Sequence, residues 1–210
     1  MKNDLIIIGA GGHAKVIIDI LKKNKDYNVL GCIDKEKDKL IIDVPVIGDD
    51  NDLAKLYSKG VKYAFVALGS NKVRKKLSED LLKIGYELIN VISKDSIVSD
   101  NVKLGKGIAI MPGAIINIES TIEDGAIVNT GATVDHDCLI GPYVHIAPGC
   151  NIAGCVKVGE GSFLGVGSCV IDRISIGDWV TIGGGAAVVN DIESNCTVVG
   201  VPARIIKIKE

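Results

Sequence analysis

The chain has 210 residues, of which 47% are apolar and only 4% aromatic, so one or two compact domains with aliphatic cores are expected. A formal net charge of −2 provides no basic surface for nucleic acid. No apolar run reaches the length of a membrane span and no signal segment opens the sequence, so we expect a cytoplasmic protein without membrane insertion.

The first predicted strand, 5–10, leads into a glycine-rich loop, Gly9-Ala10-Gly11-Gly12-His13. Apolar residues then recur at helical spacing to about residue 21, and a second strand, 29–33, ends at Asp34. Strand, glycine loop, helix and strand form a βαβ unit, which predicts a parallel sheet.

The glycine loop matches the G-x-G-x-x-G/A fingerprint of dinucleotide-binding proteins through Gly9, Gly11 and Ala14, and Asp34 follows about twenty residues later. However, the region 1–91 is long enough for one mononucleotide-binding half and too short for two. Backbone N–H groups at a helix N-terminus bind phosphates of many kinds. We therefore predict a Rossmann-like domain at 1–91 that binds a nucleotide sugar, and an NAD-linked oxidoreductase is the most distant alternative.

Two more strands are predicted in this domain, at 63–68 and 87–92, and a helix is expected at 49–59. Gly69 follows the strand 63–68 and precedes a basic helix, which places it where ligands bind in open parallel sheets. Most of the basic side chains at 72–76 are expected to form a solvated helix face.

From Ile92 to Val188 every sixth residue is Ile, Leu or Val, without a break. A small side chain, such as Ala114 or Ala132, follows many of these positions four residues later. A period of six fits neither a helix nor a lone strand, but it fits the hexapeptide β-helix, whose unit is a short strand and a corner. Three units form a coil of about eighteen residues, so residues eighteen apart stack like neighbouring strands. We predict a parallel β-helix over 92–192 and an exit segment over 193–210.

The six cysteines form no CxxC pair and no histidine–cysteine metal spacing. Cys138 and Cys150 fall at the small inward position of the repeat. We expect most of the six to be small buried side chains, with no disulfide and no bound metal.

Seven motifs are spread over nearly the whole chain: Gly9 to His13, Gly69 to Lys76, Asn129-Thr130, Val134-Asp135-His136-Asp137-Cys138, Ala153-Gly154, Gly183 to Ala186, and Val199 to Ala203. Together they resemble a branch of the hexapeptide acyltransferases: the nucleotide-sugar N-acetyltransferases of the bacillosamine pathway and the related sialic acid O-acetyltransferases. The resemblance implies a left-handed β-helix, although parallel crossovers are generally right-handed. It also implies acetyl-CoA as cosubstrate, no metal, and a homotrimer with active sites between subunits.

His136 stands two residues after the inward Val134, so it is expected at a corner of the coil, pointing outward. Asp137 beside it can hold the imidazole in one tautomer and favour its protonated form. An unperturbed histidine titrates at about 6.5 and can accept the proton that an amine loses when it attacks a thioester. We predict that His136 is a general base oriented by Asp137. The family typically has Glu at the second position, and the shorter Asp leaves open whether the contact is direct or through water.

Adding eighteen to 136 places Gly154 on the next coil above His136. Its N–H could stabilise the negative charge that develops on the thioester oxygen, while the simpler alternative is that Gly154 only eases a corner. The resemblance assigns the matching glycine the first role. It also places Asn129 in the active cleft, in contact with the acceptor.

The resemblance puts the CoA arm along outward faces of the later coils, near Val166 and Gly184, with His145 lining the same cleft. Which chain supplies each group is left open by the sequence.

In the N-terminal domain the resemblance implies that Gly11, Gly12 and His13 hold the pyrophosphate of the acceptor. Asp34 would face the uracil or the ribose, and Gly69 would border the site. His13 can equally be an ordinary residue of the first helical turn.

Together these expectations describe an enzyme that moves acetyl from acetyl-CoA to the amine of a UDP-linked 4-amino-dideoxy sugar. The alternatives are an O-acetyltransferase acting on sialic acid or another sugar hydroxyl, an N-acetyltransferase for a differently linked nucleotide amino sugar, and a nucleotide-binding scaffold with an inactive coil.

Overall fold

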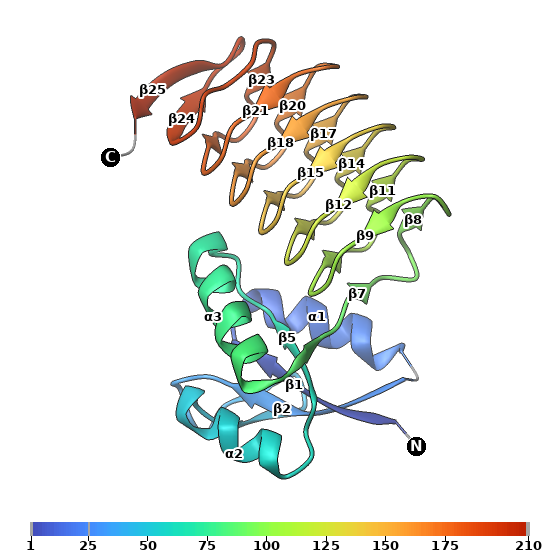
Figure 1. Ribbon diagram of the computed structural model, residues 1–210, viewed down its shortest axis with the longest axis vertical. Coiled ribbons are helices and arrows are strands. Elements are labelled where there is room, and N and C mark those ends of the chain that lie inside the picture. The colour runs from blue at the N-terminus through green and yellow to red at the C-terminus, as the bar shows by residue number, and fades with distance from the viewer. Residues whose placement is uncertain (1, 25, 209–210) are drawn as a thin grey trace. The chain divides into compact units, whose positions relative to one another are not determined.

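The computed structural model describes residues 2–24 and 26–208 and divides into two compact units, Met1–Val91 and Ile92–Glu210. Figure 1 shows a sheet with helices in the first unit and a stack of short strands in the second. Residues 1, 25, 209 and 210 of the predicted domains lie outside the described residues.

The N-terminal unit is a Rossmann-like α/β domain, as predicted. Its elements are β1 (Asn3–Ile8), α1 (Gly12–Lys22), β2 (Tyr27–Ile33), β3 (Leu40–Ile41), β4 (Val44–Gly48), the 3₁₀ turn η1 (Asp50–Asp52), α2 (Leu53–Ser58), β5 (Tyr63–Val66), α3 (Asn71–Ile84) and β6 (Glu87–Leu88). The six strands form one sheet in the order β3-β4-β2-β1-β5-β6. All neighbours pair in parallel except β3 and β4, which form an antiparallel pair.

Strand β1 is buried on both faces of this sheet. Ile6 and Ile8 pack in one apolar cluster with Leu53 of α2, whereas Leu5 and Ile7 point the other way and are also fully buried. A parallel sheet needs both faces covered, which explains why β1 is a nearly continuous apolar run rather than an alternating one.

The strands β3 and β4 have no counterpart among the strands that the sequence predicts. Strand β3 is only two residues long, and β4 contains Pro45, which lacks the N–H that a sheet interior uses. The expected helix at 49–59 is divided into η1 and α2. Short elements of this kind carry too little periodicity to be recognised.

The second unit is a left-handed parallel β-helix, as predicted. Its two-residue strands are β7 (Val91–Ile92), β8 (Ile97–Val98), β9 (Lys103–Leu104), β10 (Ala109–Ile110), β11 (Ile115–Ile116), β12 (Thr121–Ile122), β13 (Ile127–Val128), β14 (Thr133–Val134), β15 (Leu139–Ile140), β16 (His145–Ile146), β17 (Asn151–Ile152), β18 (Lys157–Val158), β19 (Phe163–Leu164), β20 (Cys169–Val170), β21 (Ser175–Ile176), β22 (Thr181–Ile182) and β23 (Ala187–Val188). Every third strand joins the same sheet, and each pair is offset by eighteen residues, as in Ile127 with His145.

These sheets form three faces of a prism. The first face contains β7, β10, β13, β16, β19 and β22, the second contains β8, β11, β14, β17, β20 and β23, and the third contains β9, β12, β15, β18 and β21. We call the turn from first to second face the first corner and the turn from second to third face the second corner. Residues 129–132 and 135–138 are examples.

The second residue of each strand points into the prism. From Ile110 to Val188 all of these residues belong to one buried cluster, together with small residues such as Ala126 and Cys150. The predicted inward position therefore holds along the coil. The exception is the first coil, where Ile92 is 40% exposed and Val98 and Leu104 are half-buried, because no earlier coil lies beneath them.

The two corners differ in how they adopt a left-handed backbone. At the first corner the residue with positive φ is glycine in five successive coils: Gly113, Gly131, Gly149, Gly167 and Gly185. At the second corner the equivalent residues all carry side chains: Glu119, Asp137, Cys155 and Arg173, with φ between 57° and 61°. The second corner therefore presents an unbroken column of functional groups, spaced by one coil.

After β23 the regular period ends. Ile192 still pairs with Ile176, at a spacing of sixteen, and β24 (Cys196–Val199) then joins the first face beside β22. Strand β25 (Arg204–Ile208) adds to β24 in antiparallel orientation, so the exit segment closes the end of that sheet.

All six cysteines are free thiols in the structure. Cys32, Cys138, Cys150 and Cys196 are buried, Cys155 is half-buried and Cys169 is exposed. The buried position of Cys138 and Cys150 in the prism agrees with their place in the repeat. Among the described residues, no helix has the length and apolar character that crossing a bilayer requires.

Strand β15 offers a matched test of the inward position. Ile140 is fully buried in the prism, while its neighbour Leu139 points outward and is 40% exposed. Replacing Ile140 by Ala should lower the free energy of unfolding by about 2–5 kcal/mol, because the closed interior cannot collapse on the void. Leu139→Ala should cost less than about 1 kcal/mol. Denaturant unfolding measures both, and equal losses would contradict the assignment.

Candidate active site

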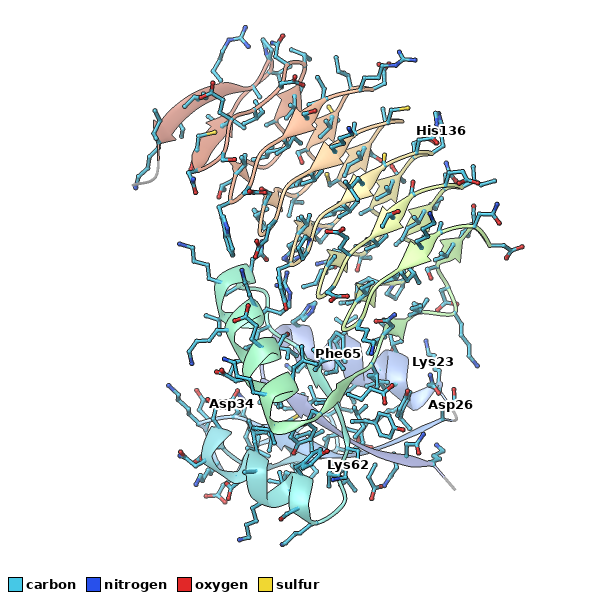
Figure 2. The ribbon with its side chains drawn as sticks, in the orientation of Figure 1. Lys23, Asp26, Asp34, Lys62, Phe65 and His136 are labelled. Atoms are coloured by element: carbon cyan, nitrogen blue, oxygen red, sulfur yellow. The ribbon has the colours of Figure 1, made fainter. Side chains whose placement is uncertain are left out.

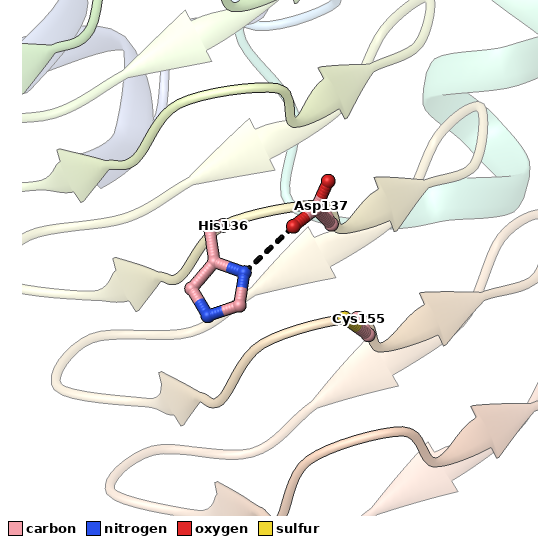
Figure 3. Close-up of side chains that lie close together, drawn as sticks. All are labelled: His136, Asp137 and Cys155. Carbon is pink, nitrogen blue, oxygen red and sulfur yellow. Dashed lines mark hydrogen bonds and ion pairs between the residues drawn. The ribbon is translucent and has the colours of Figure 1, made fainter.

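His136 and Asp137 form a direct contact at the second corner, between β14 and β15. The imidazole Nδ1 lies 2.7 Å from Oδ2 of Asp137 (Figure 3). Asp137 reaches back to the ring because its backbone has a φ of 57°. The shorter carboxylate therefore needs no bridging water. Both side chains are open to solvent, with 51% and 57% of their surfaces exposed, and Figure 2 shows His136 at the edge of the coil.

Asp135 is a second carboxylate at this corner, and sequence reasoning gave it no role. Its Oδ1 accepts hydrogen bonds from the His136 backbone N–H and from Nδ2 of Asn117, both at 2.8 Å. The Asn117 contact is the main reason that the pKa of Asp135 is held below its usual range. A negative charge is thus kept beside the ring, while the backbone of His136 is fixed to the coil below.

The pKa of His136 is raised above its ordinary value of 6.5, chiefly because the ring donates a hydrogen bond to Asp137. The negative charges of Asp135 and Asp137 also favour the protonated ring, and the positive charge of Arg173 opposes them. With Nδ1 held by Asp137, Nε2 is the nitrogen available to exchange a proton with a ligand. A more basic ring is a stronger proton acceptor once it is neutral.

Gly154 lies against the His136 ring, one coil further on, as the eighteen-residue period predicts. A β-carbon on Gly154 would lie only 2.6 Å from Cε1 and 2.7 Å from Nε2 of that ring. The Gly154 carbonyl accepts a hydrogen bond from the Arg173 N–H at 3.0 Å. Within residues 2–24 and 26–208 no group accepts a hydrogen bond from the Gly154 N–H. The Gly154 backbone thus lies beside the His136 ring with its N–H unengaged by those residues.

Cys155 also belongs to this corner, and sequence reasoning missed it. Its N–H donates to the His136 carbonyl at 2.9 Å, and its thiol lies near the His136 and Asp137 side chains (Figure 3). The signal was present in the sequence, because the addition of eighteen that connects His136 with Gly154 also connects Asp137 with Cys155.

Asn129 and His145 meet at the first corner, not at the second. The Asn129 Oδ1 accepts a hydrogen bond from the Thr130 N–H at 2.8 Å, which fixes the orientation of the amide. Its Nδ2 then faces Nε2 of the buried His145 at 3.0 Å. Because an amide nitrogen can only donate, the neutral His145 carries its proton on Nδ1. The Phe163 ring meets His145 edge-on at 5.2 Å.

Two of the predicted cofactor residues, Val166 and Gly184, share the corner of Asn129, whereas Gly154 does not. Val166 follows β19, Gly184 follows β22, and both are exposed at the first corner. His136 and Gly154 lie at the second corner, on the other side of the strands of the second face. One chain therefore brings the predicted base together with Gly154 but not with Val166 and Gly184.

In the N-terminal unit the sheet order reverses between β1 and β5, which is where open α/β sheets bind ligands. Gly9 has a φ of 103°, and a β-carbon there would lie 2.8 Å from Leu68 Cδ2, so the turn needs glycine. Oδ2 of Asp34 accepts a hydrogen bond from the Ala10 N–H at 2.8 Å. Asp34, Gly9 and Lys76 line a pocket of about 320 Å³ at these strand ends.

The other predicted acceptor residues lie outside the lining of this pocket. Gly11 and Gly12 are exposed at the start of α1, and Gly69 is exposed before α3. A β-carbon on any of these three glycines would meet no neighbouring atom within 4 Å, so a ligand can approach their backbone closely.

His13 is half-buried in the first turn of α1. Burial, reinforced by the positive charge of Arg74, lowers the pKa of His13 to about 4. Arg74 departs from the expected solvated helix face: it is buried, and its guanidinium donates to the Leu68 carbonyl at 3.0 Å and the Gly69 carbonyl at 3.4 Å. At neutral pH His13 is therefore uncharged.

Residues 4–81 match the family model described as the PglD N-terminal domain. The chain is 31% identical over 170 residues to GDP-perosamine N-acetyltransferase from Escherichia coli O157:H7, covering 78% of this chain and 76% of the relative. Among solved structures it resembles PerB from Caulobacter crescentus in complex with CoA and GDP-perosamine, with 43% identity, 98% of each chain covered and a TM-score of 0.94. The acetyltransferase domain of PglB from Neisseria gonorrhoeae is 36% identical, with 98% and 100% of the chains covered and a TM-score of 0.94.

The chain has three histidines, so a histidine-labelled sample should give three ring signals in an NMR titration. We expect the His136 signal to titrate above 6.5 and the His13 signal at about 4. Asp137→Asn should move the His136 midpoint down towards 6.5, because the carboxylate that stabilises the imidazolium is lost. Spectra of His136→Ala and His13→Gln assign the signals. If the Asp137→Asn substitution left the midpoint of the His136 titration unchanged, the result would contradict the pairing of His136 with Asp137.

Gly154→Ala should displace the His136 ring without unfolding the coil, since the atoms that the new methyl meets are the end of a flexible side chain. We expect the His136 pKa to fall towards 6.5 as the ring leaves Asp137, while the melting temperature stays within a few degrees of the parent, a range that corresponds to about 1 kcal/mol. An unchanged His136 titration would show that Gly154 does not position the ring.

Proposed function

The chain belongs to the hexapeptide-repeat sugar N-acetyltransferases, which use acetyl-CoA, and from this membership we propose that it acetylates the amine of a nucleotide-linked 4-amino-dideoxy sugar. The observation that supports the chemistry is the His136–Asp137 pair beside the Gly154 N–H. A base, its orienting carboxylate and an available backbone donor are the groups that acyl transfer to an amine requires.

In the proposed reaction the neutral sugar amine attacks the thioester carbonyl carbon, and the carbonyl electron pair moves onto oxygen. His136 Nε2 takes the proton that the amine loses, and Asp137 stabilises the resulting imidazolium through Nδ1. The Gly154 N–H donates to the oxyanion, a contact of a kind commonly worth about 3–4 kcal/mol in the transition state. The tetrahedral intermediate then collapses, the C–S bond breaks, and the CoA sulfur leaves with the proton from His136.

The nucleotide of the acceptor is proposed from the relatives. The resemblance in the sequence alone suggests a UDP-linked sugar, whereas PerB, at 43% identity, was solved with GDP-perosamine. We take a GDP-linked amino sugar as the first candidate and a UDP-linked one as the alternative. Gly11 and Gly12 at the start of α1, with His13, would hold the pyrophosphate, because helix N-termini present N–H groups to phosphate.

Asp34 and Gly69 complete the proposed acceptor site. Asp34 follows β2, orders the glycine loop through Ala10 and lines the pocket, and these contacts support a role for its carboxylate in accepting a hydrogen bond from a ribose or a base. Gly69 borders the neighbouring strand end, where the bare backbone leaves room for the ligand.

The separation of the two corners supports a homotrimer with active sites between neighbouring chains. The second corner of one chain, with His136, would face the first corner of its neighbour, with Asn129. CoA would then lie in the same cleft, along Val166 and Gly184, with His145 holding Asn129 in place. Asn129 would hydrogen-bond the acceptor.

The test is release of CoA thiol from acetyl-CoA with GDP-linked and UDP-linked amino sugars and with sialic acid. We expect release with a nucleotide-linked amino sugar, and a decrease in kcat of about 10²–10⁴-fold in His136→Ala, because proton transfer to a positioned base contributes that much. CoA binding by calorimetry should persist in the variant. If sialic acid were the only acceptor turned over, the result would favour O-acetylation. If the His136→Ala variant kept full activity, His136 would not be the general base.

A further inference from the structure

The second corner brings together three side chains that can bind a metal ion. One ligand atom each from His136, Asp137 and Cys155 lies within 4.8 Å of the other two (Figure 3). Their backbones are held in register, because the Cys155 N–H donates to the His136 carbonyl at 2.9 Å. Asp137 and Cys155 occupy the same left-handed position in successive coils, with φ of 57° and 60°, so their side chains leave the coil in the same direction.

The donor set suits zinc better than magnesium or calcium. An imidazole nitrogen, a thiolate sulfur and a carboxylate oxygen are all common Zn²⁺ ligands, whereas Mg²⁺ and Ca²⁺ prefer oxygen alone. His136 and Asp137 are half exposed, so an ion can enter from solvent and keep one coordination position for water. The three ligand atoms, which lie within 4.8 Å of one another, must close in by side-chain rotation to reach tetrahedral zinc distances of about 2.0–2.3 Å from a common centre.

We propose that His136, Asp137 and Cys155 form a Zn²⁺ site whose occupation reversibly inhibits the enzyme. This inhibition rests on the proposed function, because the ion would occupy the residues assigned to proton transfer. It is a regulatory site and not a resident cofactor site.

The inhibition follows from the two nitrogens of the imidazole. His136 Nδ1 is the nitrogen that faces Asp137, at 2.7 Å, and it is therefore the zinc ligand. When zinc replaces the Nδ1 proton, a neutral ring must carry its proton on Nε2, and that nitrogen can no longer accept one from the amine. The thiol of Cys155 loses its proton to solvent and binds as thiolate. One Zn²⁺ enters, the ring proton moves from Nδ1 to Nε2, and one proton is released.

Metal binding is tested directly on the 210-residue chain. Zn²⁺ is titrated by calorimetry, and Co²⁺ is used as a spectroscopic substitute, because sulfur coordination produces charge-transfer absorption that nitrogen and oxygen ligands do not. We expect one ion per chain, and Cys155→Ala should weaken zinc binding by at least about 10-fold, as losing a ligand costs more than losing a supporting contact. Cys169→Ala is the matched control, since Cys169 is the exposed cysteine outside the cluster.

Inhibition is measured as the activity of each variant with zinc, divided by its own activity with EDTA. Zinc should lower this ratio in the parent and in Cys169→Ala, EDTA should restore it, and Cys155→Ala should need at least about 10-fold more zinc. The proposed site would be overturned if Cys155→Ala left the affinity for zinc unchanged. It would also be overturned if the cobalt spectrum lacked the sulfur charge-transfer band. Zinc-dependent activation would overturn the inhibitory role. If no acceptor is turned over, the proposed function fails, while calorimetry and the cobalt spectrum still decide whether the metal site exists.

Discussion

The structure depends on one constraint: every eighteen residues the backbone must return to the same corner and hydrogen-bond to the coil beneath it. Ile127 pairs with His145 and Thr133 with Asn151, and the same offset continues along each face. The inward side chains fill a closed aliphatic interior, so a one-residue slip would turn apolar residues outward. Because the register is fixed so strictly, side chains from distant parts of the sequence form straight columns on the outside.

Those columns explain the division of the candidate site. The second corner holds the imidazole and the carboxylate, and the first corner holds Asn129 with its buried partner His145. A rigid prism cannot fold one edge onto another, so groups at different corners can act together only across a boundary between chains. The arrangement thus links the proposed chemistry to the proposed assembly, and it would account for a His136–Asp137 pair that is half exposed in a single chain.

The sequence predicted the β-helix and the stacking of Gly154 on His136 because both follow from a simple period with an aliphatic interior. It did not predict β3 and β4, which are too short to show a period. Arg74 was expected among solvated basic residues, because a pattern of charges does not reveal that one guanidinium bonds to carbonyls at the end of a strand. Cys155 follows Asp137 by the same eighteen residues, but the period gives only its place on the corner and not the approach of its thiol to the imidazole and the carboxylate.

The two corners also differ in the type of residue that adopts the left-handed backbone conformation. At the first corner glycine adopts the left-handed conformation without steric opposition, whereas at the second corner Asp137, Cys155 and Arg173 adopt it with side chains, at a cost of roughly 1 kcal/mol for each residue. A sequence selected for stability alone would place glycine or asparagine there too. The side chains proposed to act at this edge are therefore retained at the expense of folding free energy, and replacing them with glycine would relieve the backbone while removing the proposed chemistry.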